Sequence, residues 1–217
     1  MKIALVGGTG DIGKGFALRW AEQHEIIIGS RKADKALESA AQVREVLGEG
    51  IVSGTDNKSA VESAELVVLC VPHEHLNSVT YDLKASYINQ IVVSPVVPMS
   101  YNGKNFAFTP PAEGCAALQI QSLLPNGTKL VSAFHTICAA ALQDRSRELH
   151  GDVMICGDDN EARELVASLV REIENLRPLD AGPLSASGIV ESLTPMLLNV
   201  ARRNKIKDAG IRIIQER

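Results

Sequence analysis

A glycine-rich turn lies close to the amino terminus, directly after a short apolar run. Residues 8–13 read Gly-Thr-Gly-Asp-Ile-Gly, which follows the spacing G-x-G-x-x-G. Glycines at this spacing let the backbone approach a pyrophosphate and direct the amino terminus of the following helix at it. The alternative is a glycine turn without a ligand. Because residues 2–6 are typical of a strand and residues 12–21 of an amphipathic helix, the context favours dinucleotide binding, with Gly8 in the turn.

Basic residues follow the next predicted strand, at 25–29. Ser30, Arg31 and Lys32 come directly after it, and Lys35 lies one helical turn further on. Sites for NAD usually carry a carboxylate here, which would repel a 2′-phosphate, whereas a hydroxyl, a guanidinium and an ammonium would bind one. The alternative is a solvated basic helix start, which is unfavourable beside the helix dipole without an anion. The sequence therefore predicts NADP rather than NAD.

Three histidines follow predicted strands. His73 and His75 come directly after the apolar run 66–71, and His135 follows the strand predicted at 130–134. Ligands of open α/β sheets bind at this carboxyl edge, so we expect His73 and His75 to form a wall of the cofactor pocket. For His135 a functional role and a structural role both remain open. No Cys, Asp or further His is spaced to complete a metal site with the pair, so we predict no metal.

A dehydrogenase of alcohols or hydroxy acids needs a positioned acid or base, because a proton moves as well as a hydride. The sequence contains no Tyr-x-x-x-Lys pair for this task. A second cofactor as the hydride partner would remove much of the need. We therefore assign no catalytic side chain.

The elements expected to position these residues alternate along the chain. Apolar runs at 2–6, 25–29, 66–71, 91–93, 130–134 and 153–156 are separated by helical patterns or long connections. This alternation predicts an α/β fold with a doubly wound parallel Rossmann sheet. We place the dinucleotide-binding domain at 1–181, and at 182–217 a small C-terminal helical segment that packs on the sheet domain or on a partner subunit. Segment 94–129 contains five prolines and is expected to form an irregular loop beside the site.

Composition excludes several classes of partner and fold. The 217 residues are 45% hydrophobic and 22% charged, with a net charge of −4, as in ordinary globular proteins. No basic stripe is present, so we expect no nucleic acid or membrane partner. The four cysteines are widely spaced, and the first residues lack the features of a signal peptide, so we expect free thiols in a cytoplasmic protein.

Seven segments together resemble one known family. They are residues 8–13, 30–31, 71–75, 93–98, 132–137, 179–184 and 191–195. The chain resembles the NADPH-dependent reductases of coenzyme F420, found in archaea and some bacteria. The resemblance implies hydride exchange between NADP(H) and the deazaflavin coenzyme F420, with the two rings stacked face to face in a cleft.

The resemblance also implies which residues meet each part of the two cofactors. Thr9, Gly10, Asp11 and Ile12 would contact the pyrophosphate; Ser30, Arg31 and Lys35 the 2′-phosphate; His73, His75, Met99 and Ala139 the nicotinamide side; and Val97, Pro98, His135 and Ile137 the deazaflavin. Three residues depart from the family pattern: His73, Cys138 and Asp11 stand where Trp, Pro and Asn are common.

Two other functions remain open at this stage. One is NADPH-dependent reduction of another acceptor, such as a flavin, a ferric chelate or an imine, because fold alone does not select the acceptor. The other is a non-enzymatic NADP sensor. The apolar residues Ile206, Ile211, Ile213 and Ile214 near the carboxyl end lead us to expect a homo-oligomer.

Overall fold

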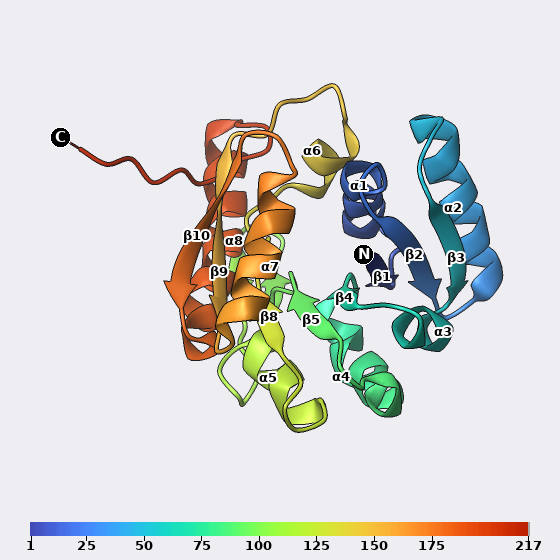
Figure 1. The fold of residues 1–217 in the computed structure, drawn as a ribbon. Helices are drawn as coiled ribbons and strands as arrows, with labels where there is room; N and C mark the ends of the chain where they lie inside the picture. The colour runs from blue at the N-terminus through green and yellow to red at the C-terminus, as the bar shows by residue number, and fades with distance from the viewer. Residues whose placement is uncertain (217) are drawn as a thin grey trace.

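The protein forms one large sheet with helices on both faces (Figure 1). The computed structural model describes residues 1–216. The eight strands of this sheet are β1 (Lys2–Val6), β2 (Glu25–Ser30), β3 (Val52–Asp56), β4 (Leu66–Leu69), β5 (Ile91–Ser94), β8 (Leu130–Ser132), β9 (Gly151–Gly157) and β10 (Leu176–Gly182). Their order across the sheet is β10-β9-β8-β5-β4-β1-β2-β3.

Helices α1 to α7 form two layers, each with its own apolar core against one face of the sheet. The first layer contains α1 (Asp11–Trp20), α2 (Ala33–Leu47), α6 (Ala139–Gln143) and α7 (Asn160–Arg171). The second contains α3 (Asn57–Glu62), α4 (His73–Asp82) and α5 (Ala116–Leu123). Successive residues of β1 point to opposite layers, which explains why this strand is a continuous apolar run rather than an alternating one.

The direction in which the chain winds reverses between the two central strands, β1 and β4. β2 and β3 follow β1 on one side, whereas β5 and β8 follow β4 on the other, and all neighbouring pairs from β3 to β8 are parallel. The loops after β1 and β4 diverge at this point and leave a crevice at the carboxyl edge. The predicted α/β doubly wound fold is confirmed, with a sheet that is mainly parallel.

One edge of the sheet differs from the all-parallel expectation, because β9 runs antiparallel to β8. The chain from 133 to 150 stays at the carboxyl edge and passes beside α1, where the Arg19 guanidinium donates hydrogen bonds to the carbonyls of Ala141, Leu142 and Asp144. The chain therefore enters β9 at the edge where β8 ended and must run back. β10 then pairs parallel to β9.

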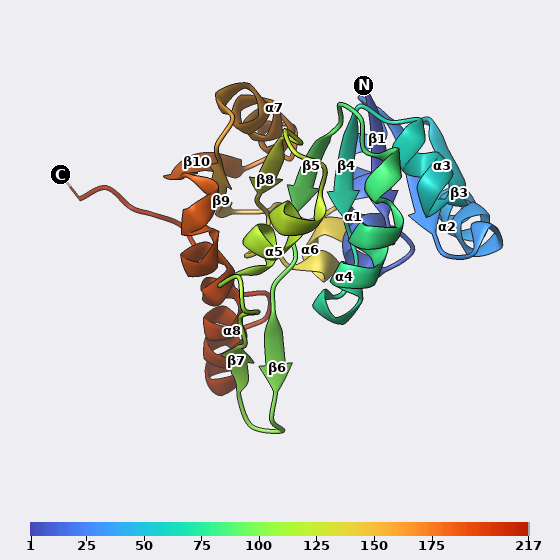
Figure 2. The same cartoon turned by 90° about the horizontal axis from the view of Figure 1, so that it is seen from below.

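The proline-rich segment contains ordered elements that its sequence does not predict. The short strands β6 (Met99–Tyr101) and β7 (Phe106–Phe108) form an antiparallel hairpin, and α5 follows. The last helix, α8 (Ser187–Asn204), lies along this hairpin (Figure 2). Asn199 of α8 accepts a hydrogen bond from the Phe106 N–H and donates one to the Phe106 carbonyl, as a neighbouring strand would. The C-terminal helix is thus attached to the hairpin and to α5.

Within residues 1–216, no helix has the length and apolar character needed to cross a membrane.

Candidate cofactor-binding cleft

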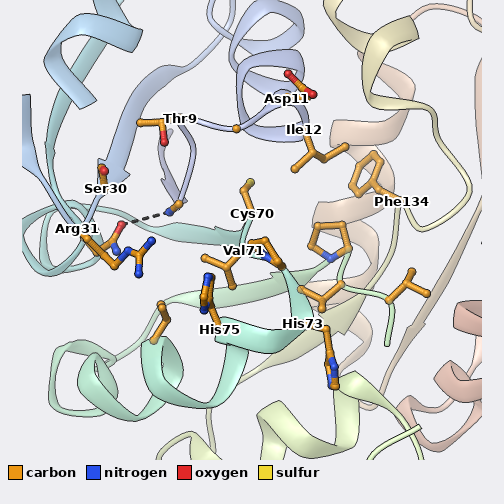
Figure 3. A pocket seen from close by; sticks show the side chains of 18 of the residues that line it. Thr9, Asp11, Ile12, Ser30, Arg31, Cys70, Val71, His73, His75 and Phe134 are labelled. Atoms are coloured by element: carbon orange, nitrogen blue, oxygen red, sulfur yellow. Dashed lines mark hydrogen bonds between the residues drawn. The ribbon is translucent and has the colours of Figure 1, made fainter. Parts of the chain in front are cut away.

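A cavity of about 1000 Å³ lies at the carboxyl edge of the sheet, where the loops after β1 and β4 diverge. It brings together most of the residues predicted from the sequence. These are Thr9, Gly10, Asp11, Ile12, Ser30, Arg31, Lys35, His73, His75, Val97, Met99, His135 and Ile137. Figure 3 shows Ser30 and Arg31 at one end of the cavity and Phe134 and His73 at the other. The cavity is therefore long, and its two ends differ in chemistry.

Three predicted residues are not among those that line the cavity. Gly8 is buried, and its N–H is 3.0 Å from the carbonyls of both Leu5 and Gly29. Pro98 is buried, and its carbonyl accepts a hydrogen bond from Thr109 at 2.9 Å. Ala139 begins α6, which packs against α1. Contact of these three residues with a cofactor remains a prediction.

The glycine turn is tightly packed at Gly7 and Gly13 and has free space at Gly10. Gly7 has φ +69°, and a Cβ there would lie 2.5 Å from Val71 Cγ1. A Cβ on Gly13 would lie 2.4 Å from the Cα of Gly8. At Gly10 the nearest atom to an added Cβ, the Gly7 carbonyl oxygen, is 3.9 Å away. The first N–H groups of α1 have no partner within the helix, so this open turn has the shape and polarity to hold a pyrophosphate.

The end of the cavity at β2 and α2 is cationic. Arg31, Lys32 and Lys35 are exposed, and none of them forms an ion pair within residues 1–216. Ser30 is buried at the end of β2, and its Oγ accepts a hydrogen bond from the Lys32 N–H at 3.3 Å. In the described part of the chain, Asp11 is the one acidic side chain that lines the cavity. This end fits a phosphate monoester.

The opposite end includes His73, and a second histidine of α4, His75, also lines the cavity but has different surroundings. His73 is half-buried, and its Nε2 is 2.9 Å from Oε1 of the buried Gln119 on α5. His75 Nε2 is 3.7 Å from a carboxylate oxygen of the exposed Glu74. The imidazole of His73 therefore contacts a buried side chain, whereas the imidazole of His75 is partly exposed to solvent.

His135 reaches the same end through a sharp turn after β8. Phe134 has φ 70°, a left-handed conformation that is uncommon for an aromatic residue, and its ring packs against Phe16 and Trp20. His135 is buried; its Nε2 is 3.2 Å from Ser132 Oγ, and its Nδ1 has no protein partner among residues 1–216. Burial lowers the pKa of His135 to about 4, so its ring is neutral at pH 7.

Several lining residues were not predicted from the sequence. They are Gly7, Asn57, Cys70, Val71, Pro72, Val79, Pro95, Val96, Phe134 and Thr194. Many of them adjoin predicted residues and could have been included on that ground. Asn57, which accepts a hydrogen bond from the Gly7 N–H at 3.2 Å, follows a strand that lacks a clear apolar pattern. Thr194 lies in the distinctive segment 191–195 and donates a hydrogen bond to the His135 carbonyl at 2.8 Å.

Comparisons with known proteins agree with this geometry. The sequence profile of the family described as "NADP oxidoreductase coenzyme F420-dependent" matches residues 2–98. The F420-dependent NADP reductase of Methanocaldococcus jannaschii is 39% identical, over 98% of both chains. The enzyme of the same name from Methanothermobacter thermautotrophicus is 36% identical, over 98% of this chain and 94% of the relative.

A solved structure supports the fold. A crystal structure of an Arthrobacter sp. FB24 protein superposes with a TM-score of 0.82 at 24% identity, covering 99% of this chain and all of the other. The similarity to the archaeal relatives extends over nearly the whole chain, and so includes the cavity, α5 and α8. The expected resemblance is confirmed: this chain belongs to the family of NADP oxidoreductases that depend on coenzyme F420.

Proposed function

We propose that this protein transfers a hydride between NADP(H) and the deazaflavin coenzyme F420. The observation that carries the proposal is the cavity itself, which joins a cationic, phosphate-compatible end to an end lined by apolar side chains and a neutral histidine. The names of the archaeal relatives give the same pair of substrates.

At the cationic end the protein's task is to select and anchor the dinucleotide. We assign the pyrophosphate to the open turn at Thr9, Gly10, Asp11 and Ile12, where the first N–H groups of α1 point outward. We assign the 2′-phosphate to Ser30, Arg31 and Lys35, and we add Lys32 because it lines the same cavity beside them. Charge-assisted hydrogen bonds from these groups favour NADP over NAD.

At the opposite end the task is to align two rings and exclude water. We assign the nicotinamide side to His73, His75, Met99 and Ala139, and the deazaflavin side to Val97, Pro98, His135 and Ile137. The bound rings supply the chemistry, a direct hydride transfer between two carbon atoms. The buried His135 contributes a neutral polar surface and no charge. Catalysis is then mainly positioning, which agrees with the lack of an assigned catalytic acid or base.

The test is anaerobic mixing of the purified protein with NADPH and coenzyme F420, followed by the visible absorbance of the deazaflavin. We expect rapid bleaching with NADPH and little with NADH. Free flavin, a ferric chelate and a cyclic imine serve as alternative acceptors. Bleaching confined to one of those acceptors would move the function to that class, and tight NADPH binding without turnover of any acceptor would favour a sensor.

We propose a homo-oligomer as the working state. The support is a set of large apolar side chains that remain exposed on and after α8: Ile189, Met196, Val200, Ile206, Ile213 and Ile214. Light scattering after size exclusion measures the mass directly. A monomeric mass at micromolar concentration would contradict the proposal.

We also propose that the protein works in the reducing cytoplasm. Cys70, Cys115, Cys138 and Cys156 are all free thiols. Burial raises the pKa of Cys70 and Cys156, so both are weak nucleophiles at neutral pH. Fractionation of the native host cell would test this placement.

A further inference from the structure

A buried side chain behind the cavity wall contacts one wall residue, His73. Gln119 on α5 does not line the cavity, is 8% exposed, and has its Oε1 2.9 Å from Nε2 of His73. A carboxamide oxygen can only accept a hydrogen bond, so with Oε1 of Gln119 facing it, Nε2 of His73 would carry the proton. In a neutral imidazole, Nδ1 is then the acceptor. His73 therefore meets a ligand with a defined tautomer.

The partner of His73 is itself held in place. The N–H groups of Ala116 and Ala117, at the start of α5, donate to the two carboxylate oxygens of Glu191 on α8, at 2.9 and 3.0 Å. Glu191 is fully buried, so these bonds do not compete with water. Gln119 lies one turn further along the same helix. The side chain that contacts His73 thus lies on a helix anchored to α8, whereas within residues 1–216 no buried side chain hydrogen-bonds to His75.

We propose that Gln119 is a positioning residue for the nicotinamide end of the cavity. By keeping the proton of His73 on Nε2, it presents Nδ1 as an acceptor for an N–H of the nicotinamide carboxamide. The inference rests on the proposed function, because it requires a nicotinamide cofactor at this wall. In this arrangement the cavity wall recognises the carboxamide group of the nicotinamide and not the pyridine ring alone.

The acetylpyridine analogue of NADP⁺ provides a direct test, because its acetyl group keeps the carbonyl and lacks the N–H donors. Calorimetric titration gives the affinity of the protein for each dinucleotide. We expect the wild type to prefer NADP⁺, and Gln119→Leu to reduce that preference about fivefold, the value of one ordinary hydrogen bond. Gln121→Leu is the matched control, since Gln121 is an exposed glutamine on the same helix.

The outcomes separate this inference from the proposed function. Equal weakening of both dinucleotides in Gln119→Leu would mean that Gln119 only supports the fold, and the inference would be lost. Failure of the wild type to bind either dinucleotide would refute the proposed function instead. Normal binding with an unchanged preference in Gln119→Leu would leave the function intact and remove the role of Gln119.

A double-mutant cycle tests whether Gln119 acts through His73. His73→Phe removes the acceptor, so we expect it to reduce the preference by the same factor as Gln119→Leu, and the double variant to show no further loss. Additive losses would show that the two residues act separately.

The tautomer can be observed without any ligand and without the Gln119→Leu variant. In protein labelled with ¹⁵N-histidine, side-chain correlations distinguish an Nε2–H ring from an Nδ1–H ring. We expect the Nε2–H form for His73, assigned by comparison with His73→Phe. An Nδ1–H ring would overturn the inference even if Gln119→Leu failed to fold.

Discussion

The two ends of the cavity are built in different ways. The phosphate end consists of residues close together in the sequence, on the turn after β1 and at the start of α2, and its cations are exposed. The opposite end joins α4, the turn after β8, and α8, and its contacts are buried. We therefore expect changes at the first end to alter binding alone. Changes at the second end should alter binding and stability together.

The largest effect is expected for Phe134→Ala at the buried end. Phe134 is 2% exposed, with ring centroids 5.0 Å from Phe16 and 5.6 Å from Trp20. Removing a buried aromatic ring costs about 4 kcal/mol of unfolding free energy. Denaturant unfolding measures this loss, and Phe106→Ala, at a half-buried phenylalanine of the hairpin, is the control. Similar losses in the two variants would show that the turn after β8 is not part of the main core.

The next effect is a pH dependence of stability that arises at Glu191. Burial raises the pKa of Glu191 to about 7 from an ordinary value of 4.5, so the folded state binds this proton more tightly than the unfolded state. Its contribution to stability is fully present below about pH 4.5 and is lost as the pH rises through 7. Between these two limits, the protonation of Glu191 contributes about 3 kcal/mol to the free energy of unfolding. Denaturant unfolding from pH 5 to 8 measures the slope.

Glu191→Gln provides the control for that slope, because an amide does not titrate in this range. We expect this variant to be less stable than the wild type at pH 5 and to show a flatter dependence. If both proteins lost stability in parallel from pH 5 to 8, the dependence would have to come from other groups.

At the phosphate end, Arg31→Glu should weaken NADPH binding about 100-fold, because it replaces a charge-assisted hydrogen bond with repulsion of the 2′-phosphate. NADH lacks this group, so its binding should change less than about threefold. The melting temperature should stay close to that of the wild type. Lys84→Glu, an equal charge change beyond the far end of α4, controls for long-range electrostatics. Equal loss for both dinucleotides would refute the 2′-phosphate assignment.

The smallest effect is expected for Lys35→Ala. Lys35 is exposed, so water and salt screen its interaction with the ligand, and NADPH affinity should fall only about threefold at physiological salt. The loss should shrink further at high salt. A loss that does not depend on salt would indicate a direct, desolvated contact.

Much of the phosphate end could be predicted because its signals are local. The strand at 2–6, the glycine turn and the helix that follows form one continuous segment, and Arg31 follows the next strand directly. β3 was missed because Val52–Asp56 has few apolar residues, as is common for a strand at the edge of a sheet. Asn57, which supports the glycine turn, was missed with it.

By itself, the sequence determined the α/β class, the family, the preference for NADP and most residues of the cleft. Each of these depends on the order of residue types within short segments, where neighbours along the chain are also neighbours in space. Only the tertiary structure decided the direction of β9, the hairpin along α8, and the pairing of His73 with Gln119 across 46 positions. Such contacts join segments that are far apart in the sequence, so they form only when the chain folds. Because the contact between His73 and Gln119 is shielded from water, it can orient the His73 side chain more strongly than an exposed contact would.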